Sequence, residues 1–586
     1  MSEPRRTRTT PSGRAAAKRS APTGRFSLLL AVLGGLLLIV TVQLVRIQLI
    51  DGPEYAASAA EQRLGEITIS PERGFILDRE GAVLAETVPA KTVYAVPSAV
   101  VDPQAAAEAI AGALGGDAAE YLAKIERGGN YQYMARKADP ARVAALEALE
   151  IEGLDFQEDS RRVYPSNELA CQVLGFVGVD DAGLSGLELF YDDLLAGEPG
   201  LLISERDRER RPIPGGVTYE EEAVDGQDLV LTIDKDIQYQ AQVTLVGAVE
   251  RWGAKAGSVI VMDPTNGEIL AMASVPQFNP NRFGEADDAA YRNRSVVDAY
   301  EPGSTIKSLT AAAVIEEGLF APASMFELPP TIVVGGRTIG EAHPRETVTW
   351  SLTDIVTNSS NVGAVKLGQA LGEERLYEYF SRFGLTEKTG IDYPGEARGA
   401  LPPVEQWSAS SVATIPFGQG ISVTPLQLAR ALASIANGGE LVTPHLLRSV
   451  PDSPEMELSW PKERAISEAT AAAMRQVLAD VVTEGTGAGA SVPGYTVAGK
   501  TGTAQKARTD GVAGYATGRY VASFSGFLPA EDPRILVIVS IDEPSNSIYG
   551  GTVAAPAFAE IAGFAVEHLK IPPTVPVTTG SQPGDG

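Results

Sequence analysis

This chain is poor in the residues that most often carry catalysis or hold metals. Its 586 residues include three histidines, His343, His445 and His568, and one cysteine, Cys171. The histidines lie far apart and show no paired ligand spacing, which argues against a Ser-His-Asp hydrolase and against a zinc enzyme. We interpret Cys171 as a small buried apolar residue, because no basic residue or histidine lies near it in sequence to activate a thiol. A lone cysteine also excludes an internal disulfide.

Positive charge is scarce outside the N-terminus. The net charge is −27, yet residues 1–50 hold eight Lys or Arg against the single acid Glu3. Residues 1–25 contain too few large apolar side chains to fold, so we expect them to form a disordered tail. The rest of the chain is strongly acidic, which argues against binding to nucleic acid.

An uncharged apolar run extends from Phe26 to Val45. At about 1.5 Å per residue it is long enough to cross a bilayer core of about 30 Å. A cleavable signal peptide is the alternative, but its apolar region would be shorter and would end in a small-x-small site. We therefore expect a single spanning helix over residues 26–48. The basic tail predicts a cytoplasmic N-terminus, with everything from about residue 49 outside the cytoplasm.

The tetrapeptide Ser304-Thr305-Ile306-Lys307 opens an apolar stretch that runs to Ile315. On a helix, residues at i and i+3 are neighbours, and the helix N-terminus favours a neutral amine. An uncharged lysine can take the proton of a serine nucleophile. A second S-x-x-K copy, Ser459-Trp460-Pro461-Lys462, contains proline and is followed by polar residues. We interpret that copy as a solvated loop.

Two partner motifs follow the first copy in order. Ser359-Ser360-Asn361 opens a helical pattern over 362–371, and Lys500-Thr501-Gly502-Thr503 lies on an alternating segment typical of a strand. Strand patterns at 520–528 and 534–541 place this second motif on a sheet. Another K-T-G copy, Lys388-Thr389-Gly390, lies in a loop rich in glycine and proline, so we discard it.

Two other motifs have structural interpretations. Thr424-Pro425-Leu426-Gln427 matches a capping box with proline at the first helical position, which predicts a helix start. Gly485-Thr486-Gly487-Ala488-Gly489 follows a helical pattern, whereas a dinucleotide-binding loop would follow a strand. We interpret it as a hinge.

The ordered set S-x-x-K, S-x-N and K-T-G resembles that of the serine penicillin-recognising enzymes. Further segments extend the resemblance to the transpeptidase domain of class B penicillin-binding proteins over roughly residues 226 to 570. These segments are Leu231-Thr232-Ile233-Asp234, Gly267-Glu268-Ile269-Leu270-Ala271-Met272-Ala273, Phe417-Gly418-Gln419-Gly420 and Ala498-Gly499-Lys500-Thr501-Gly502-Thr503-Ala504-Gln505.

The resemblance implies an α+β fold with a penicillin-recognising serine transpeptidase domain, an antiparallel sheet flanked by helices. It also implies an elongated α+β module, the pedestal, between this domain and the membrane helix. The expected order is tail (1–25), transmembrane helix (26–48), pedestal (49–222), transpeptidase domain (223–571) and a flexible tail (572–586).

The resemblance further implies a role for each motif residue. Ser304 would attack the carbonyl of a D-Ala-D-Ala stem peptide, Lys307 would be the base, and Ser359 would pass a proton to the departing D-alanine. Asn361 would hold the substrate amide, and the backbone N–H groups of Ser304 and Thr503 would form the oxyanion hole. The terminal carboxylate would bind at the K-T-G motif, which consists of Lys500, Thr501, Gly502 and Thr503. No cofactor and no metal are expected.

The pedestal carries motifs similar to those of the class B N-terminal module. The segment 73–84 reads as a hairpin with its turn at Arg79-Glu80-Gly81, and two more motifs lie at 162–165 and 183–188. We predict that Arg73, Asp78 and Glu188 help fix the pedestal in the posture that engages a partner polymerase. The alternative is that these charges merely pair at a domain junction.

The resemblance also narrows the class. With no histidine before His343, the chain lacks the polymerase motif of bifunctional class A proteins. It should therefore crosslink peptidoglycan, bind β-lactams, and act with an FtsW-like glycan polymerase and other division proteins. Patterns at 384–391 and 424–429 favour the division-specific, FtsI-type member at the septum. The alternatives are an elongation-specific transpeptidase, a β-lactamase, a β-lactam sensor, or a division scaffold with an inactive site.

Overall fold

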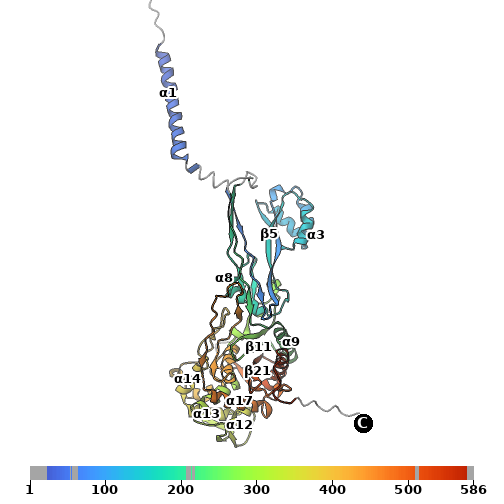
Figure 1. Cartoon of the computed structure of the whole chain (residues 1–586), viewed down its shortest axis with the longest axis vertical. Helices are drawn as coiled ribbons and strands as arrows, with labels where there is room; N and C mark the ends of the chain where they lie inside the picture. Colours follow the sequence, from blue (N-terminus) through green and yellow to red (C-terminus); the bar gives the residue numbers. More distant parts are fainter. Residues whose placement is uncertain are drawn as a thin grey trace, which may run out of the picture. The chain divides into compact units, whose positions relative to one another are not determined.

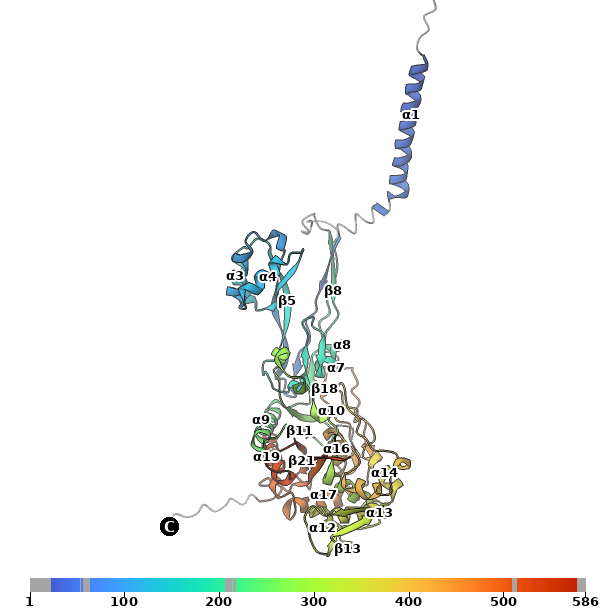
Figure 2. The same ribbon diagram turned by 180° about the vertical axis from the view of Figure 1, so that it is seen from behind.

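The computed structural model describes residues 23–52, 54–55, 64–205, 213, 218–508 and 514–576. The chain divides into two compact units (Figures 1 and 2). The first unit comprises residues 1–70 and 199–223, and the second comprises residues 71–198 and 224–586. The segment predicted as the pedestal is thus shared between them. Most of the tail predicted at residues 1–25, and residues 577–586, lie outside the described residues.

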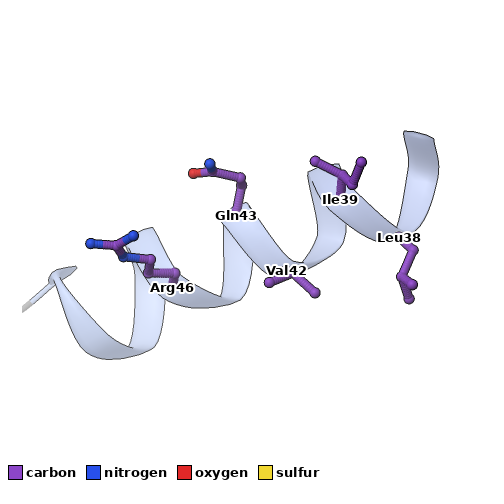
Figure 3. A pocket seen from close by; sticks show the side chains of 5 residues that line it. All are labelled: Leu38, Ile39, Val42, Gln43 and Arg46. Atoms are coloured by element: carbon purple, nitrogen blue, oxygen red, sulfur yellow. The ribbon is translucent and has the colours of Figure 1, made fainter. Parts of the chain in front are cut away.

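The first unit contains the long apolar helix α1 (Thr23–Val45), which continues into η1 (Arg46–Ile50). Residues 24–50 are long and apolar enough to cross a membrane, as the sequence predicts, although α1 begins three residues before the predicted start. Figure 3 shows the side chains that line a pocket along this helix, which are Leu38, Ile39, Val42, Gln43 and Arg46. The unit also contains an antiparallel sheet in the order β1-β8-β9, made of β1 (Leu64–Ile69), β8 (Gly200–Glu205) and β9 (Thr218–Glu221).

The second unit begins with a mixed sheet in the order β18-β10-β2-β3-β4, with β5 also paired to β3. The predicted hairpin is confirmed, because Ile76 pairs with Ala85 and Leu77 pairs with Val83. Three helices pack on this sheet around Val93, Ile110 and Leu146. The elements are β2 (Ile76–Leu77), β3 (Val83–Ala95), β4 (Gln132–Ala138), β5 (Leu154–Val163), β10 (Leu229–Leu231), β18 (Leu447–Ser449), α3 (Pro103–Leu114), α4 (Ala118–Glu126) and α5 (Pro140–Glu147).

Short elements connect this sheet to the rest of the second unit. They are α6 (Cys171–Leu174), β6 (Phe176–Val177), β7 (Gly183–Ser185), α7 (Gly186–Phe190) and α8 (Asp192–Leu195). One apolar core runs through them from Leu84 and Leu187 to the helices around the candidate site. Cys171 is buried as predicted, and burial raises the pKa of its thiol to about 12. The thiol is therefore protonated at neutral pH.

A five-stranded antiparallel sheet in the order β12-β11-β22-β21-β20 forms the centre of the remaining part. Its strands are β11 (Ala256–Met262), β12 (Ile269–Val275), β20 (Ala498–Ala507), β21 (Tyr515–Leu528) and β22 (Ile535–Asp542). One face packs against α9 (Lys235–Trp252) and α19 (Ala555–His568) through residues such as Leu245 and Phe558 (Figure 2). Alternating side chains such as Ile260 and Ile538 enter the core on the other face.

On that other face, the helices α10 (Arg294–Val297), α16 (Pro425–Ala436) and α17 (Glu468–Thr483) contact the strands, and α18 (Gly550–Val553) contacts β20 and β21. The other helices of this part are α11 (Lys307–Glu316), α12 (Leu352–Thr357), α13 (Asn361–Leu371), α14 (Glu373–Arg382) and α15 (Ser411–Thr414). Two small hairpins extend the helical side, β13 (Met325–Leu328) with β16 (Val348–Ser351), and β14 (Thr331–Val334) with β15 (Arg337–Gly340). Strands β17 (Glu440–Leu441) and β19 (Glu463–Arg464) pair next to α16. The expected α+β fold is confirmed, and so is the capping box of Thr424 and Gln427 at the start of α16.

Candidate active site

Ser304 lies in the 3-10 turn η5 (Gly303–Ile306), and α11 begins at Lys307. The sequence predicts the serine in the first turn of an α-helix, so the observed turn is tighter. Gly303 explains the difference, since its φ of +56° is a left-handed conformation that favours glycine. An added Cβ there would lie 3.2 Å from Cβ of Ala504 and 3.4 Å from the Thr503 carbonyl oxygen. The close approach sets Ser304 beside strand β20, which carries the K-T-G motif.

Lys307 joins the first two motifs. Its Nζ donates to the Ser359 carbonyl oxygen at 2.6 Å and to Asn361 Oδ1 at 2.8 Å, and it lies 3.2 Å from Ser359 Oγ. Burial lowers the pKa of Lys307 well below its usual value, and the charge of Lys500 lowers it further. A neutral amine has a lone pair that can accept a proton. The side chain is therefore suited to act as a base.

Lys500 lies on β20 and is also fully buried. Burial lowers its pKa to about 7. Among the described residues its Nζ has only long contacts, 3.4 Å to Thr501 Oγ1 and 3.5 Å to the Thr501 carbonyl oxygen. An ammonium with such weak partners is available to an anionic group of a ligand.

The rest of the K-T-G motif is held by neighbours that sequence reasoning did not find. Thr501 Oγ1 lies 2.9 Å from Thr486 Oγ1, and Gly550 donates its N–H to Thr503 Oγ1 at 3.2 Å. Gly502 leaves no room for a side chain, because an added Cβ would lie 2.3 Å from Ser523 Oγ. The segment 485–489, which the sequence predicts as a hinge, packs as a turn against β20.

The Ser304 hydroxyl makes no hydrogen bond within the part of the chain that the structure describes. The side chain is half-buried, and the Lys307 amine is held by the S-x-N turn instead. Catalytic hydrogen bonds often tighten only when substrate binds. The serine is therefore accessible, with a base one turn away.

Two acidic residues outside the predicted motifs border the site. Glu341 accepts from Ser360 Oγ at 2.6 Å and from the Asn361 N–H at 2.7 Å. Glu301 accepts from the Gly420 N–H at 2.9 Å, and burial raises the pKa of its carboxyl. Neither residue lies in a motif whose spacing marks it, which is why the sequence did not reveal them.

Comparisons with known proteins agree with this geometry. The family model of the penicillin-binding protein transpeptidase domain matches residues 257–563, and that of the penicillin-binding protein dimerisation domain matches residues 68–231. The chain is a class B penicillin-binding protein.

The relatives of this class B protein include a peptidoglycan D,D-transpeptidase and penicillin-binding proteins. It is 36% identical to Stage V sporulation protein D of Bacillus subtilis, over 94% of this chain and 87% of that protein. It is 36% identical to PbpB of Mycobacterium tuberculosis (92% and 84% covered) and 34% identical to the peptidoglycan D,D-transpeptidase FtsI of Escherichia coli (88% and 86% covered). The crystal structure of penicillin-binding protein 3 from M. tuberculosis with aztreonam matches with a TM-score of 0.67 and 32% identity, over 87% of this chain and 99% of that one.

The two motif copies that we discarded are structural in this class B protein. Thr389 donates its N–H and its hydroxyl to Glu396 Oε1, each at 2.6 Å, so that K-T-G copy stabilises a loop. Ser459 and Lys462 lie in an irregular segment before β19, and the lysine side chain is 41% exposed. Both interpretations are confirmed.

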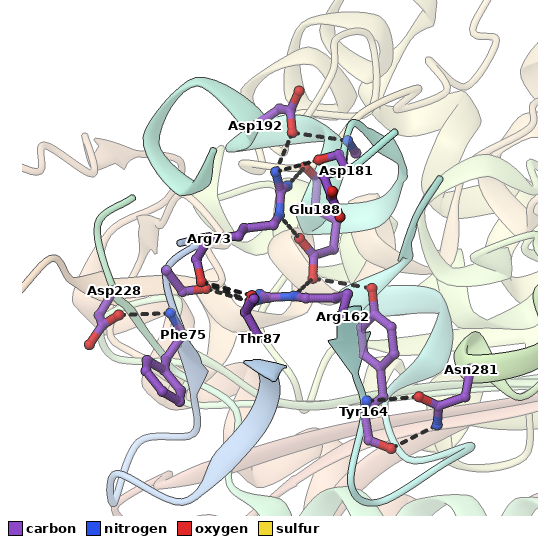
Figure 4. Close-up of polar contacts among 12 residues, drawn as sticks. Arg73, Phe75, Thr87, Arg162, Tyr164, Asp181, Glu188, Asp192, Asp228 and Asn281 are labelled. Atoms are coloured by element: carbon purple, nitrogen blue, oxygen red, sulfur yellow. Dashed lines mark hydrogen bonds and ion pairs between the residues drawn. The ribbon is translucent and has the colours of Figure 1, made fainter. Parts of the chain in front are cut away.

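Two of the three predicted pedestal residues meet in a buried ion cluster (Figure 4). Glu188 is fully buried and accepts from Arg73 Nε and Arg162 Nε, both at 2.7 Å, and from Tyr164 Oη at 3.2 Å. Arg73 also pairs with Asp192 at 2.7 Å. The cluster joins segments that are far apart in sequence.

The third predicted pedestal residue, Asp78, lies outside this ion cluster and binds backbone N–H groups. Asp78 Oδ1 accepts from the N–H groups of Glu80 and Ala82, and Oδ2 accepts from the N–H of Lys235. The carboxylate therefore closes the β2–β3 turn and fastens it to the start of α9. Short acidic side chains often fix turns in this way.

Proposed function

We propose that this chain is a membrane-anchored peptidoglycan D,D-transpeptidase that crosslinks stem peptides through an acyl-enzyme on Ser304. The observation that carries the proposal is the buried Lys307, whose amine contacts both Ser359 and Asn361 and whose pKa is lowered. Membership of the transpeptidase family supports the reaction class.

Acylation follows from the positions of these groups. Ser304 Oγ attacks the carbonyl carbon of the penultimate D-alanine while Lys307 Nζ takes the hydroxyl proton. The N–H groups of Ser304 and Thr503 hold the oxyanion. The C–N bond then breaks, and the departing D-alanine receives a proton through Ser359. The products are a Ser304 ester and free D-alanine.

Deacylation transfers the peptide to an amine of a neighbouring strand. The amine nitrogen attacks the ester carbonyl, the ester C–O bond breaks, and Ser304 recovers its proton from the amine.

Before acylation, Lys500 and the threonines at 501 and 503 bind the terminal carboxylate of the donor, for which the weakly partnered Lys500 ammonium is suited. A β-lactam acylates Ser304 by the same attack on its ring carbonyl.

We also propose that the protein acts from the outer side of the cytoplasmic membrane at the division septum. The basic N-terminus before the apolar helix supports this topology. The chain's own segments 384–391 and 424–429 and its identity to FtsI support the septal role, with an FtsW-like polymerase as partner. The sporulation relative is as similar as PbpB, so imaging of a fluorescent fusion at septum, side wall and forespore is the test.

Mass spectrometry of the full chain in detergent tests the reaction itself. With a stem-peptide donor and an amine acceptor, we expect a crosslinked peptide, one D-alanine released per crosslink, and a trapped acyl group on the peptide that contains Ser304. A penicilloyl ester that persists for many minutes separates a transpeptidase from a β-lactamase. Hydrolysis of penicillin with turnover, and no crosslink, would reject the proposal.

A further inference from the structure

A carboxylate outside the three motifs holds the S-x-N turn from the side. Glu341 directly follows strand β15, and its side chain is 7% exposed. Oε1 accepts from Ser360 Oγ at 2.6 Å, and Oε2 accepts from the Asn361 N–H at 2.7 Å. Arg345 pairs with the same carboxylate from the next turn of chain. Both oxygens are thus committed to two consecutive residues of the motif.

The preceding residue also fixes the Asn361 side chain. The Gly340 carbonyl oxygen accepts from Asn361 Nδ2 at 3.0 Å, which leaves Asn361 Oδ1 to accept from Lys307 Nζ. The Gly340 carbonyl oxygen therefore determines which end of the Asn361 amide faces the lysine, while Glu341 holds the backbone of the same residue. A reversed amide would present an N–H group to Lys307 in place of the oxygen.

Strain at the neighbouring serine shows why such a hold is needed. Ser359 has φ of +56°, a left-handed conformation that costs free energy in any residue with a side chain. Lys307 binds its carbonyl oxygen on one side, and the Ser360–Asn361 pair anchored by Glu341 follows on the other. Strained residues persist where surrounding contacts determine their conformation.

The hairpin that carries Glu341 is itself anchored to α13. Ile339 of β15 is buried against Ala364 and Val365 of that helix. Because α13 begins with Asn361, the hairpin and the motif share one packing surface. The carboxylate therefore has a fixed position relative to the S-x-N turn.

We propose that Glu341 is a positioning residue of the transpeptidase reaction, which holds Ser359 and Asn361 in the arrangement that receives the Lys307 amine. This inference rests on the proposed function of Ser304 and Lys307. Glu341 acts on the reaction through the S-x-N turn and through its charge, and it does not contact the reacting atoms.

The charged groups around Lys307 give the proposal a signature beyond loss of rate. Lys500 lowers the pKa of Lys307 together with burial, whereas Glu341 raises it, and Arg345 pairs with Glu341. Removing the Glu341 charge should lower the pKa of Lys307 further. In a plot of acylation rate against pH, the fall of the rate on the acidic side, which follows protonation of Lys307, should then move to lower pH.

The test compares Glu341→Gln with Glu346→Gln in the full chain, using acylation by a fluorescent penicillin from pH 5 to 9. Glu346 is an exposed residue of the same segment, so its variant makes the same charge change away from the turn. We expect Glu341→Gln to acylate roughly ten- to a hundredfold more slowly, since a carboxylate acceptor is replaced by an amide that cannot satisfy both donors. The fall of its rate on the acidic side should move to lower pH, while Glu346→Gln matches the parent in both respects.

The controls separate the possible failures. Labelling of Ser304→Ala would overturn the proposed function itself. Suppose that Ser304→Ala is not labelled. The positioning role is then wrong if Glu341→Gln acylates within threefold of the parent rate, or if it acylates more slowly with the same pH dependence as the parent. Should Glu341→Gln not fold, Glu341→Asp decides. We expect this variant to keep the pH dependence of the parent, because the charge remains, and to acylate more slowly, because its shorter side chain cannot reach both donors. An acylation rate equal to that of the parent would contradict the proposal.

Discussion

Two clusters of buried charge in this chain differ in their balance. In the pedestal, Glu188 and Asp192 face Arg73 and Arg162 in close ion pairs. In the active site, Lys307 and Lys500 are both fully buried, and the acid that raises the pKa of Lys307, Glu341, is already paired with Arg345. In the first cluster each charged group has an oppositely charged partner, whereas in the second the two lysines do not form an ion pair with any of the described residues.

This difference in pairing assigns the pedestal cluster to the stability of the fold and the active-site cluster to the acylation reaction. Where partners are matched, a buried charge keeps its usual protonation, and losing one partner destabilises the fold. Where they are unmatched, burial changes the protonation equilibrium, which is how a lysine becomes a base near neutral pH. We therefore expect substitutions in the two clusters to have separable effects on stability and on acylation.

The substitution Ser304→Ala should have the largest effect on acylation. We expect it to abolish covalent labelling by a fluorescent penicillin and to leave the melting temperature nearly unchanged, because the side chain is small and its role is chemical. Gel fluorescence and thermal melts measure the two quantities. Ser459→Ala is the matched control and should label normally, and labelling that disappears only in that variant would refute the assignment.

Lys307→Arg should have the next largest effect. Arginine keeps the charge but does not lose its proton at accessible pH, so acylation should fall by about a hundredfold or more. Stopped-flow or timed labelling gives the rate, and Lys462→Arg provides an exposed control. A rate within about threefold of the parent would mean that another group is the base.

In the pedestal, Glu188→Gln should lower stability without changing the chemistry. It leaves Arg73 and Arg162 without their shared carboxylate, which should cost about 3–5 kcal/mol of the free energy of unfolding. Glu80→Gln, on a side chain that is 76% exposed, is the control. Acylation per folded molecule should match the parent, and an unchanged melting temperature would contradict the structural role of the cluster.

The same cluster can be tested for a role toward a polymerase. Arg73 is only 5% exposed, so any effect on a partner must act through the posture of the pedestal. In a reconstituted pair with an FtsW-like polymerase, Arg73→Lys keeps the charge but removes the forked guanidinium. We expect polymerisation to fall while labelling of Ser304 persists. If Arg73→Lys loses thermal stability and labelling together, the cluster has a structural role and the proposed role toward the polymerase is wrong.

A smaller effect is expected on the KM for the donor peptide, which should depend on pH through the protonation of Lys500. Lys500, with a pKa of about 7, is protonated below that pH and neutral above it. The KM for a peptide ending in D-Ala-D-Ala should therefore rise as pH increases through 7, because the neutral amine no longer attracts the carboxylate. An amidated peptide should show no such rise, and equal behaviour of the two peptides would contradict this role.

The sequence predicted the motif residues and their strand or helix, because motif order and periodicity are local properties. It did not predict Glu341 or Thr486, since each reaches the site through packing between distant segments, the β15–α13 contact and the turn after α17. The sequence likewise did not show that Asp78 binds backbone N–H groups, whereas Arg73 meets Glu188 in the ion cluster. Membership of one module does not determine which charges meet.

The central claim is that a neutral Lys307 activates Ser304, and the pH dependence of acylation by penicillin in the unmodified chain tests it most directly. We predict that the rate falls on the acidic side with a midpoint well below the usual lysine pKa of 10.5. A rate that rises only as the pH approaches about 10, the range of an unperturbed lysine, would contradict the account.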